Sequence, residues 1–432
     1  MSDLETLQVF AMGKWMGCIS RDRKRNRLSF RYDDEWRSSR EAFPLSLSMP
    51  ITASEHGHPV VEAFLWGLLP DNDHVLRRWG QQFHVSPHTP FHLLYHVGEE
   101  CAGAIQFIRP ERLAKWPASF IPGSISWLNE KEMEERIQLL LSDHSAIRLG
   151  TDHGYFSLAG AQPKTAFYYD PEQNRWGVPS GIIPTTHIFK PAVQTFDGFV
   201  ENEHFCMRLA QAMGLSTARS SVQYFSDQPV IVIERYDRLR TNKEVIRIHQ
   251  EDMCQALARL PQQKYQAQGG PTPADILNII RQYSSNRVQD EQRFTDSLIY
   301  NWLIGGTDAH AKNYGFLIAA GGQVRMAPLY DLSSALPYPK QIDLRRAGLA
   351  MKIGGTYKLR EIGLHQWKKF AEEMRIPAKE FIQRAQQFAE MLPDAANCVE
   401  QELQEHGLQH QILSRLVKEI YTRANACLKT LI

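Results

Sequence analysis

Three side chains in the second half of the chain, Asp308, Asn313 and Asp331, have the types and spacing that phosphoryl transfer requires. That reaction needs a carboxylate to accept the proton of the attacking hydroxyl, and oxygen ligands for Mg²⁺ on the phosphates. In protein kinases the Asn ligand follows the base Asp by five residues, and a second Asp holds the metal. Asp308 and Asn313 have this spacing, and strands expected over 314–319 and 323–326 would form a hairpin that returns Asp331 toward Asn313. Because Asp and Asn are also common turn and cap residues, the pattern alone is not specific.

A segment of small residues, 157–165 (SLAGAQPKT), has a second feature of a nucleotide site. Small side chains let backbone N–H groups approach phosphate oxygens closely, and a strand directly after them can hold the loop in place. The segment is neither a Walker A loop nor a GxGxxG motif. A simple turn before a strand is therefore the plainer interpretation of this segment alone.

A strand lysine, a helix glutamate and a charged strand end complete the set. Residues 186–190 (THIFK) form an apolar strand that ends in Lys190, and the helix expected next contains Glu201 and Glu203. Kinase sites use such a lysine on the phosphates, oriented by a helix glutamate. Residues 231–238 (IVIERYDR) run into a charged turn that suits a hinge, where backbone groups pair with an adenine edge. Solvated strand ends explain either segment alone, but the order along the chain is that of the parts of a kinase.

The elements expected around these residues divide the chain into a strand-rich first part and a helical second part. Strand patterns in the first part cover residues 7–19, 28–32, 165–169, 186–189 and 229–236. Helical patterns there cover residues 61–69, 75–83, 90–97, 129–142 and 202–213. Beyond residue 250 the pattern is mainly helical, with a capping box at Thr272 and Asp275 and an amphipathic stretch from 361 onward. This is the layout of a bilobal nucleotide site, although many α+β proteins share it.

The composition argues against several other classes of protein. The 432 residues are 43% hydrophobic and 22% charged, which is typical of a globular protein with more than one domain. We find neither a membrane-spanning apolar run nor a signal-peptide pattern, so we expect a cytoplasmic location and no membrane contact. The six cysteines stand singly, which favours reduced thiols. The net charge of +1 gives no basic footprint for nucleic acid, so any DNA contact should be local or through a partner.

Long blocks of the sequence resemble the HipA family of Ser/Thr kinase toxins. The following blocks occur in the order found in that family: SLAGAQPKTA, THIFKP, NEHFCMRLA, IERYDR, HQEDMCQAL, KYQAQGGP, GGTDAHAKNYGF and APLYDLSSA. Three further blocks resemble its N-terminal subdomain: PLSLSMP, WGLLPDN and GEECAGAIQF. The resemblance covers nearly the whole chain. The HRD and DFG triplets of standard protein kinases are absent, and only their Asp and Asn positions persist.

The resemblance implies a role for each matching position. Asp308 is similar to the family's proton acceptor, and Asn313 and Asp331 are similar to its Mg²⁺ ligands. The positions implied in ATP binding are Ala159, Gly160, Ala161, Gln162, Pro163, Lys164, Lys190, Glu234, Arg235, Tyr236, His310, Ala311, Lys312, Asn313, Tyr330 and Asp331. Ser157 matches the serine that family members autophosphorylate, which expels the phosphate loop and switches the enzyme off. Glu203 is a candidate for orienting Lys190.

The fold implied by the resemblance is α+β and bilobal, a kinase-like fold with a mixed α/β N-terminal lobe and an all-helical C-terminal lobe. We expect a HipA-like N-terminal subdomain over residues 1–110. The nucleotide-binding part of the N-lobe, with the phosphate loop and the hinge, is expected over residues 111–240. The helical lobe with the catalytic loop is expected over residues 241–432.

The activity implied by the resemblance is that of an ATP- and Mg²⁺-dependent Ser/Thr kinase toxin. Family members phosphorylate a translation protein, an aminoacyl-tRNA synthetase such as the glutamyl enzyme, which stops growth and is linked to persistence. The implied partner is a small helix-turn-helix antitoxin similar to HipB, through which DNA would be contacted only indirectly. The alternative is a non-catalytic ATP-binding regulator that acts through such a repressor partner, and a small-molecule kinase is a third option. The retained set of Asp308, Asn313, Asp331 and Lys190 favours the enzyme.

Overall fold

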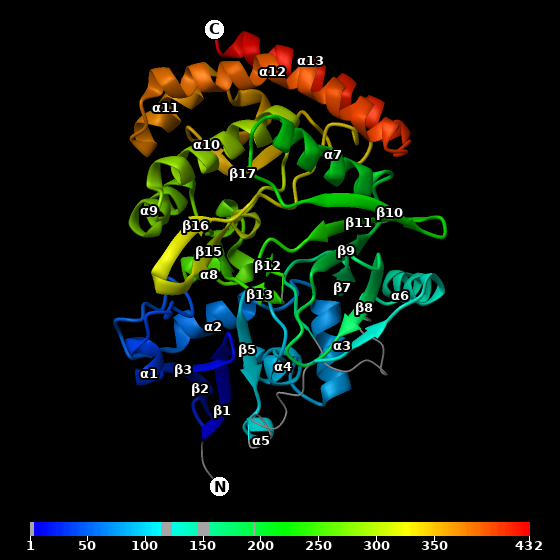
Figure 1. Ribbon diagram of the computed structural model, residues 1–432. Coiled ribbons are helices and arrows are strands. Elements are labelled where there is room, and N and C mark those ends of the chain that lie inside the picture. Colours follow the sequence, from blue (N-terminus) through cyan, green and yellow to red (C-terminus); the bar gives the residue numbers. More distant parts are fainter. Residues whose placement is uncertain (1–3, 114–122, 146–155, 193–194, 243) are drawn as a thin grey trace.

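The N-terminal part of the chain folds around a five-stranded antiparallel sheet (Figure 1). The computed structural model describes residues 4–113, 123–145, 156–192, 195–242 and 244–432. The sheet has the order β4-β3-β2-β1-β5, and its strands are β1 (Leu4–Ala11), β2 (Lys14–Asp22), β3 (Arg27–Tyr32), β4 (Glu55–His56) and β5 (Ile105–Ile108). The helices of this part are α1 (Asp34–Ser38), α2 (His58–Gly67), α3 (Asp73–Phe83), α4 (Pro90–Val97) and α5 (Pro110–Leu113). Of these, α2, α3 and α4 confirm the three helices predicted here.

The prediction of a single strand over residues 7–19 is wrong, because this segment is a hairpin. β1 and β2 pair antiparallel on either side of Met12 and Gly13, whose φ angles are 51° and 74°. Two successive residues with positive φ make a turn whose twist matches that of the paired strands. Asn and Gly usually mark such a turn, whereas Met12 continues the apolar pattern. The sequence therefore resembled one long strand.

A second sheet, of six strands, lies in the middle of the chain. It has the order β10-β11-β9-β7-β8-β6, with β6 (Ile125–Trp127), β7 (Thr165–Asp170), β8 (Arg175–Pro179), β9 (His187–Pro191), β10 (Ser220–Phe225) and β11 (Gln228–Glu234). Two helices pack on it, α6 (Glu130–Ser142) and α7 (Phe199–Ala212). The predicted strands at 165–169, 186–189 and 229–236 are confirmed as β7, β9 and β11. Their predicted ends differ from the observed ones by two residues or fewer.

The burial of β11 explains why the sheet carries a helix on each face. Val230 and Val232 pack in one cluster with Met133 of α6, whereas Ile231 and Ile233 belong to the main core that includes α7. Successive side chains of a strand point to opposite faces of the sheet. The two helices therefore cover opposite faces, and the strand that ends at the predicted hinge is buried on both sides.

The C-terminal part contains strands as well as helices, so the prediction of an all-helical C-terminal lobe is wrong. It holds the sheet β14-β15-β16 and two hairpins, with β12 (Arg238–Arg240), β13 (Val245–Arg247), β14 (His249–Asp252), β15 (Gly315–Ala319), β16 (Gln323–Met326), β17 (Gly348–Ile353) and β18 (Thr356–Lys358). The predicted hairpin β15-β16 is confirmed. The outer edge of β15 has backbone groups that need hydrogen bonds, and β14 supplies them by pairing with β15. Gly354 and Gly355, with φ of 53° and 97°, form the turn between β17 and β18.

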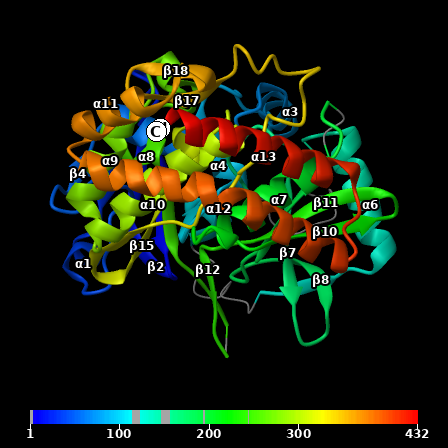
Figure 2. The ribbon, with the colours of Figure 1, turned by 90° about the horizontal axis from the view of Figure 1, so that it is seen from above.

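Helices cover this sheet and close one end of the molecule. They are α8 (Met253–Ala256), α9 (Pro273–Tyr283), α10 (Arg287–Ile304), α11 (Leu364–Met374), α12 (Ala378–Glu405) and α13 (Gln411–Thr430). Short 3₁₀ turns lie between the helices and strands of this part: η1 (Pro261–Gln263), η2 (Gln266–Gln268), η3 (Ala311–Asn313), η4 (Ala320–Gly322) and η5 (Leu359–Glu361). Figures 1 and 2 show α12 and α13 side by side above α10 and α7. The predicted capping box is confirmed, since Thr272 Oγ1 accepts from the Asp275 N–H at 3.1 Å. Within the described ranges, none of the helices has the length and apolar content needed to cross a membrane.

A buried carboxyl joins the N-terminal part to the rest of the protein. Glu251 of β14 accepts hydrogen bonds from the Ser46 hydroxyl at 2.5 Å and the Leu47 N–H at 2.8 Å. Both of these partners are neutral, so they do not fully offset the cost of burying a charged carboxylate. Burial therefore raises the pKa of Glu251 to about 8. Gln255 of α8 adds a second link, because its amide donates to the Phe64 carbonyl at 3.0 Å. These contacts hold α2 and the segment before it against the C-terminal part.

Candidate active site

A cleft with an empty volume of about 1310 Å³ brings together most of the residues predicted for the nucleotide site. The predicted residues that line it are Ala159, Gly160, Ala161, Gln162, Lys164, Lys190, Glu203, Glu234, Arg235, Tyr236, Asp308, His310, Lys312, Asn313, Tyr330 and Asp331. Three predicted residues do not line it. Pro163 lines a smaller neighbouring cavity, and Ser157 and Ala311 are fully buried beside the cleft.

The loop after α10 holds Asp308 at the cleft surface. Gly305 ends the helix in the left-handed region with φ of 66°, and the chain then turns so that Asp308 is exposed. The Asn313 amide nitrogen donates to the Asp308 carbonyl at 3.1 Å, and the His310 N–H donates to the same carbonyl at 2.8 Å. The five-residue spacing therefore closes a compact loop. The Asp308 carboxylate accepts a hydrogen bond from the Tyr265 hydroxyl and remains open to the cleft.

Asp331 reaches the cleft after the β15-β16 hairpin, as the sequence predicted. Its φ is 54°, a left-handed conformation that Asp tolerates better than most residues. The preceding Tyr330 is fixed by a hydrogen bond from its hydroxyl to the Lys312 carbonyl at 2.7 Å. Asp331 and Asn313 both face the cleft, and both come from segments that this hydrogen bond holds together.

Lys190 lies between two carboxylates. It comes from β9 and pairs with Glu203 of α7 at 2.7 Å and with Asp331. Burial by itself would lower the pKa of Lys190, but the Asp331 and Glu203 carboxylates raise it well above its usual range. Burial alone would raise the pKa of Asp331, but the ammonium groups of Lys190 and Lys164 hold it at about 2. Lys190 and Asp331 are therefore both charged, and the cleft holds a fixed cation beside a fixed anion.

The segment of small residues curls around a second lysine. The Lys164 ammonium donates to the Ala159 carbonyl at 2.7 Å, and burial lowers the pKa of Lys164 to about 8. Gly160 has φ of 107°, and a Cβ there would lie 2.4 Å from the Lys164 Nζ. Only glycine adopts this conformation without strain. The Gly160 carbonyl accepts from the Asp71 N–H at 3.1 Å, which ties the loop to the N-terminal part.

The strand end at 234–236 forms an aromatic and apolar wall of the cleft. The Tyr236 and Tyr330 rings stack with centroids 5.6 Å apart, and Ala102, Ile188 and Ile233 line the same cleft. Flat apolar and aromatic surfaces of this kind suit a purine ring. The Arg235 side chain is used elsewhere, in ion pairs with Glu100 and Asp237.

Four charged residues that line the cleft, Asp71, Asp252, Lys264 and Lys312, form three ion pairs, and the sequence prediction missed all of them except Lys312. Lys264 pairs with Asp71 at 3.2 Å, and Lys312 pairs with Asp252 at 3.0 Å. The predicted ATP-binding residue Lys312 is thus already matched by a carboxylate. Asp71 and Lys264 lie in the blocks WGLLPDN and KYQAQGGP, which were recognised as family blocks but not assigned to the site.

The donor groups in the cleft fit a Mg²⁺ ion that arrives with a nucleotide. Asn313 and Asp331 offer hard oxygen atoms, the ligand type that Mg²⁺ prefers. Among the described residues, no group of three or more His, Cys, Asp or Glu side chains could hold a metal by itself. Mg²⁺ at kinase sites takes one or two protein ligands, phosphate oxygens and waters, so a two-residue set is sufficient.

Comparison with known proteins identifies the family of the chain. Residues 7–108 match the model of the HipA N-terminal domain, and residues 156–396 match that of the HipA-like C-terminal domain. The relative named "Putative kinase Y4mE" from Sinorhizobium fredii is 36% identical over 377 residues, 86% of each chain. The Ser/Thr-protein kinase toxin HipA of Shewanella oneidensis is 28% identical over 407 residues, 90% of this chain and 88% of that protein.

The fold agrees with these sequence matches. The structure of Shewanella oneidensis HipA, solved in a complex with HipB and operator DNA, superposes with a TM-score of 0.82 and 25% identity over 98% of both chains. The expected kinase-like α+β fold is thereby confirmed. Because the C-terminal family model covers more than half of the sequence and the fold matches along nearly all of it, the chain belongs to the HipA-like family of Ser/Thr kinase toxins.

Proposed function

We propose that the protein transfers the γ-phosphate of ATP to a Ser or Thr hydroxyl of a translation protein, in a reaction that requires Mg²⁺. The observation that carries the proposal is the meeting of Asp308, the Lys190–Glu203 pair and Asp331 in one cleft. A carboxylate open to solvent, a lysine oriented by a glutamate and a second fixed carboxylate are the parts that kinase chemistry uses.

The residues have separate tasks in the proposed reaction. Tyr236 and Tyr330 would hold the purine ring, and Lys164 and Lys190 would hold the phosphates. Mg²⁺, when bound with the nucleotide at Asn313 and Asp331, would neutralise charge on the phosphates. As the substrate oxygen bonds to the γ-phosphorus, its proton would pass to the Asp308 carboxylate. The bond from the γ-phosphorus to the bridging oxygen would break, and ADP would leave.

The proposed target and partner rest on the family resemblance. The target is an aminoacyl-tRNA synthetase, with the glutamyl enzyme as the first candidate, and its phosphorylation would stop growth in the cytoplasm. The partner is a small helix-turn-helix antitoxin similar to HipB, through which operator DNA would be contacted. The solved complex of Shewanella oneidensis HipA with HipB and operator DNA supports this partner.

Labelled ATP tests the function directly. Incubation of the purified protein with labelled ATP, Mg²⁺ and a cell lysate is expected to label one or a few proteins, and chelation of Mg²⁺ should prevent it. A synthetase among the labelled proteins would identify the target. A non-catalytic regulator would instead bind ATP and label nothing. Tight ATP binding without any labelled product would therefore contradict the kinase proposal and support the non-catalytic regulator.

Ser157 is the proposed site of autophosphorylation. Its side chain is fully buried, and its hydroxyl donates to the Leu68 carbonyl at 2.7 Å. A phosphate there adds roughly −1.5 to −2 charges, which neither this buried position nor the neighbouring ATP phosphates could accommodate. We therefore expect the loop to leave the cleft once Ser157 is modified, so that the phosphorylated form no longer binds ATP.

Mass spectrometry and ATP-binding measurements check this switch. After incubation with ATP, the original protein is expected to carry a phosphate on Ser157. The Ser157→Ala variant is expected to lack this phosphate. Ser38→Ala, at an exposed serine of α1, is the matched control and should be phosphorylated normally at Ser157. Phosphorylated protein that binds ATP as well as the unmodified protein would rule the switch out.

A further inference from the structure

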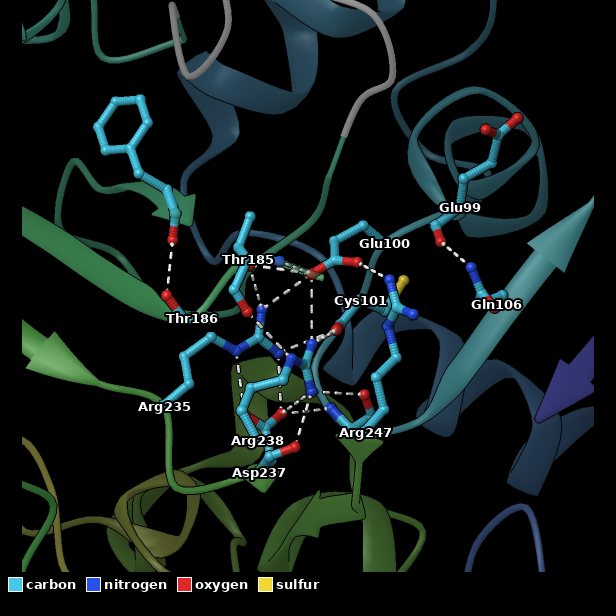
Figure 3. Close-up of polar contacts among 12 residues, drawn as sticks. Glu99, Glu100, Cys101, Gln106, Thr185, Thr186, Arg235, Asp237, Arg238 and Arg247 are labelled. Carbon is cyan, nitrogen blue, oxygen red and sulfur yellow. Dashed lines mark hydrogen bonds and ion pairs between the residues drawn. The ribbon is translucent and has the colours of Figure 1, made fainter. Parts of the chain in front are cut away.

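A buried ionic cluster borders the cleft (Figure 3). Two of its members, Arg235 and Asp237, line the cleft, but none of its side chains has a task in the proposed reaction. The cluster contains the side chains of Glu100, Arg235, Asp237, Arg238 and Arg247, none of which is more than 12% exposed. Arg235 pairs with Asp237 at 2.8 Å and with Glu100 at 3.4 Å, and Arg238 pairs with Glu100 at 3.3 Å. Arg247 contacts the other oxygen of Glu100. One carboxylate thus meets three guanidinium groups.

The charges of the cluster make Glu100 its central member. Three arginines face two carboxylates, so a surplus of one positive charge is buried even with every partner present. Burial alone would raise the pKa of Glu100, but Arg247, Arg238 and Arg235 hold it far below its usual range. Loss of one member of a buried ion pair leaves the other charge uncompensated and is strongly unfavourable. The arginines therefore keep Glu100 in place, and Glu100 keeps them together.

The cluster clamps an N-terminal segment onto the hinge. Glu100 lies between α4 and β5, whereas Arg235 and Arg238 follow β11. The contacts continue along the main chain: Arg235 donates to the Cys101 carbonyl at 3.1 Å, and the Gly103 N–H donates to Asp237 at 2.7 Å. Between these two points, Ala102 lines the cleft. The segment of residues 100–103 thus contributes Ala102 to the cleft wall beside the hinge.

The main chain of Glu100 holds the start of the phosphate loop. Its carbonyl accepts the Ser157 N–H at 2.9 Å, and Glu100 and Phe156 form a parallel bridge. Two residues later the loop itself begins at Ala159. The side chain of Glu100 therefore faces the hinge while its backbone faces the loop. One residue of the N-terminal part contacts both of the segments that would hold a nucleotide.

We propose that Glu100 is a positioning residue that couples the hinge to the phosphate loop, so that the nucleotide site is complete only while residues 100–103 are docked on the hinge arginines. The consequence for ATP rests on the proposed function, whereas the coupling itself concerns the protein without nucleotide. Loss of the Glu100 charge should free this segment, and with it the loop at Ser157. The loop would then spend more time away from the cleft.

Glu100→Gln tests the coupling, because glutamine keeps the size and an acceptor oxygen but removes the charge. Two amides report the loop: Ser157 N–H, bonded to Glu100, and Asp71 N–H, bonded to Gly160. The variant loses charge-assisted hydrogen bonds, which stabilise the docked segment more than neutral ones would. We therefore expect hydrogen exchange at both amides to be about tenfold faster in Glu100→Gln than in the original protein. Exchange in α12 should be unchanged, which separates loop release from general unfolding. ATP affinity should fall by a similar factor of about ten, with little change in kcat at saturating ATP.

Glu99→Gln is the matched control. It removes the same charge one residue away, and Figure 3 shows the Glu99 carboxylate directed away from the arginines. Exchange at the Ser157 and Asp71 amides should keep its original rate in this variant. A Glu100→Gln protein with the exchange rates of the Glu99→Gln control would overturn the proposal. Faster exchange in a protein that never binds ATP would uphold the coupling and reject the proposed function instead.

A double variant keeps the test decisive if Glu100→Gln does not fold. Glu100→Gln with Arg247→Met leaves the same surplus of one positive charge that the original cluster has, and Arg247 lies at its edge. We expect this double variant to be more stable than Glu100→Gln alone. Hydrogen exchange at the two loop amides should still be several-fold faster, roughly, than in the original protein. Loop exchange and ATP affinity identical to those of the original protein would show that the Glu100 carboxylate positions nothing.

Discussion

Replacing Asp308 by alanine is expected to abolish phosphotransfer and growth inhibition in a protein that stays folded. A positioned general base contributes on the order of 10²- to 10⁴-fold to a rate, and no other carboxylate of the loop after α10 lines the cleft. The fold should tolerate the change because the side chain is exposed and its contact with Tyr265 lies at the surface. Asn313 bonds the Asp308 carbonyl rather than its side chain, so the loop keeps its closure.

Phosphate transfer to a substrate and growth after induction are the two measurements for this variant. Asp394→Ala is the control, since Asp394 is an exposed carboxylate on α12, remote from the cleft in sequence and absent from its lining. Thermal unfolding should give nearly the same midpoint for both variants, because surface substitutions usually change stability by less than about 0.5 kcal/mol. Normal toxicity from folded Asp308→Ala would end the kinase hypothesis.

Asp331→Asn is expected to lower activity by about 100-fold or more, the size of effect seen when one fixed electrostatic contact of a transition state is lost. The substitution removes the charge that pairs with Lys190 and replaces an anionic ligand for Mg²⁺ by a neutral amide oxygen, which binds the ion more weakly. Asparagine adopts the left-handed conformation as readily as aspartate, so the φ of 54° at this position should be preserved. The loss should therefore come from charge and not from backbone strain.

Titration of ATP binding with Mg²⁺ separates the metal effect from the loss of the ion pair. In the original protein Mg²⁺ should strengthen ATP binding, and in Asp331→Asn this gain should be largely lost. The pKa of Asp331 is about 2, below its usual value, so the carboxylate is ionised at all ordinary assay pH values. The difference between the two proteins should accordingly stay constant between roughly pH 5 and pH 7, because Lys164, whose pKa is about 8, loses its charge only above that range. Equal ATP affinity with equal Mg²⁺ dependence would show that Asp331 is not the metal ligand.

The local parts of the site could be predicted from the sequence. The spacing of Asp308 and Asn313, the hairpin before Asp331 and the strand that carries Lys190 all depend on neighbours within about twenty residues. Such short-range patterns follow from strand alternation and turn chemistry. The approach of Lys190 to Glu203 was also accessible, because β9 and α7 are consecutive elements.

The long-range parts could not be predicted in the same way. Asp71 reaches Lys264 across nearly two hundred positions, and Glu100 meets arginines more than 130 positions away. No periodicity in a single sequence relates residues so far apart, and each of these side chains alone resembles an ordinary surface charge. The strands β17 and β18 were missed for a different reason: the pair is short, and only its Gly354-Gly355 turn marked it.

The position of the last two helices has a consequence for when the protein can become active during its synthesis. Both α12 and α13 pack on α7, the helix that carries Glu203, and Arg208 of α7 pairs with Glu402 of α12 at 2.5 Å. Every residue that lines the cleft precedes residue 378, where α12 begins. Ribosomes make chains from the N-terminus, so a chain interrupted before that point would hold the full set of cleft residues and still lack the cover of α7. Under the proposed function, a stalled or broken fragment would thus have a poorly supported active site, and phosphotransfer would begin only after translation of these helices.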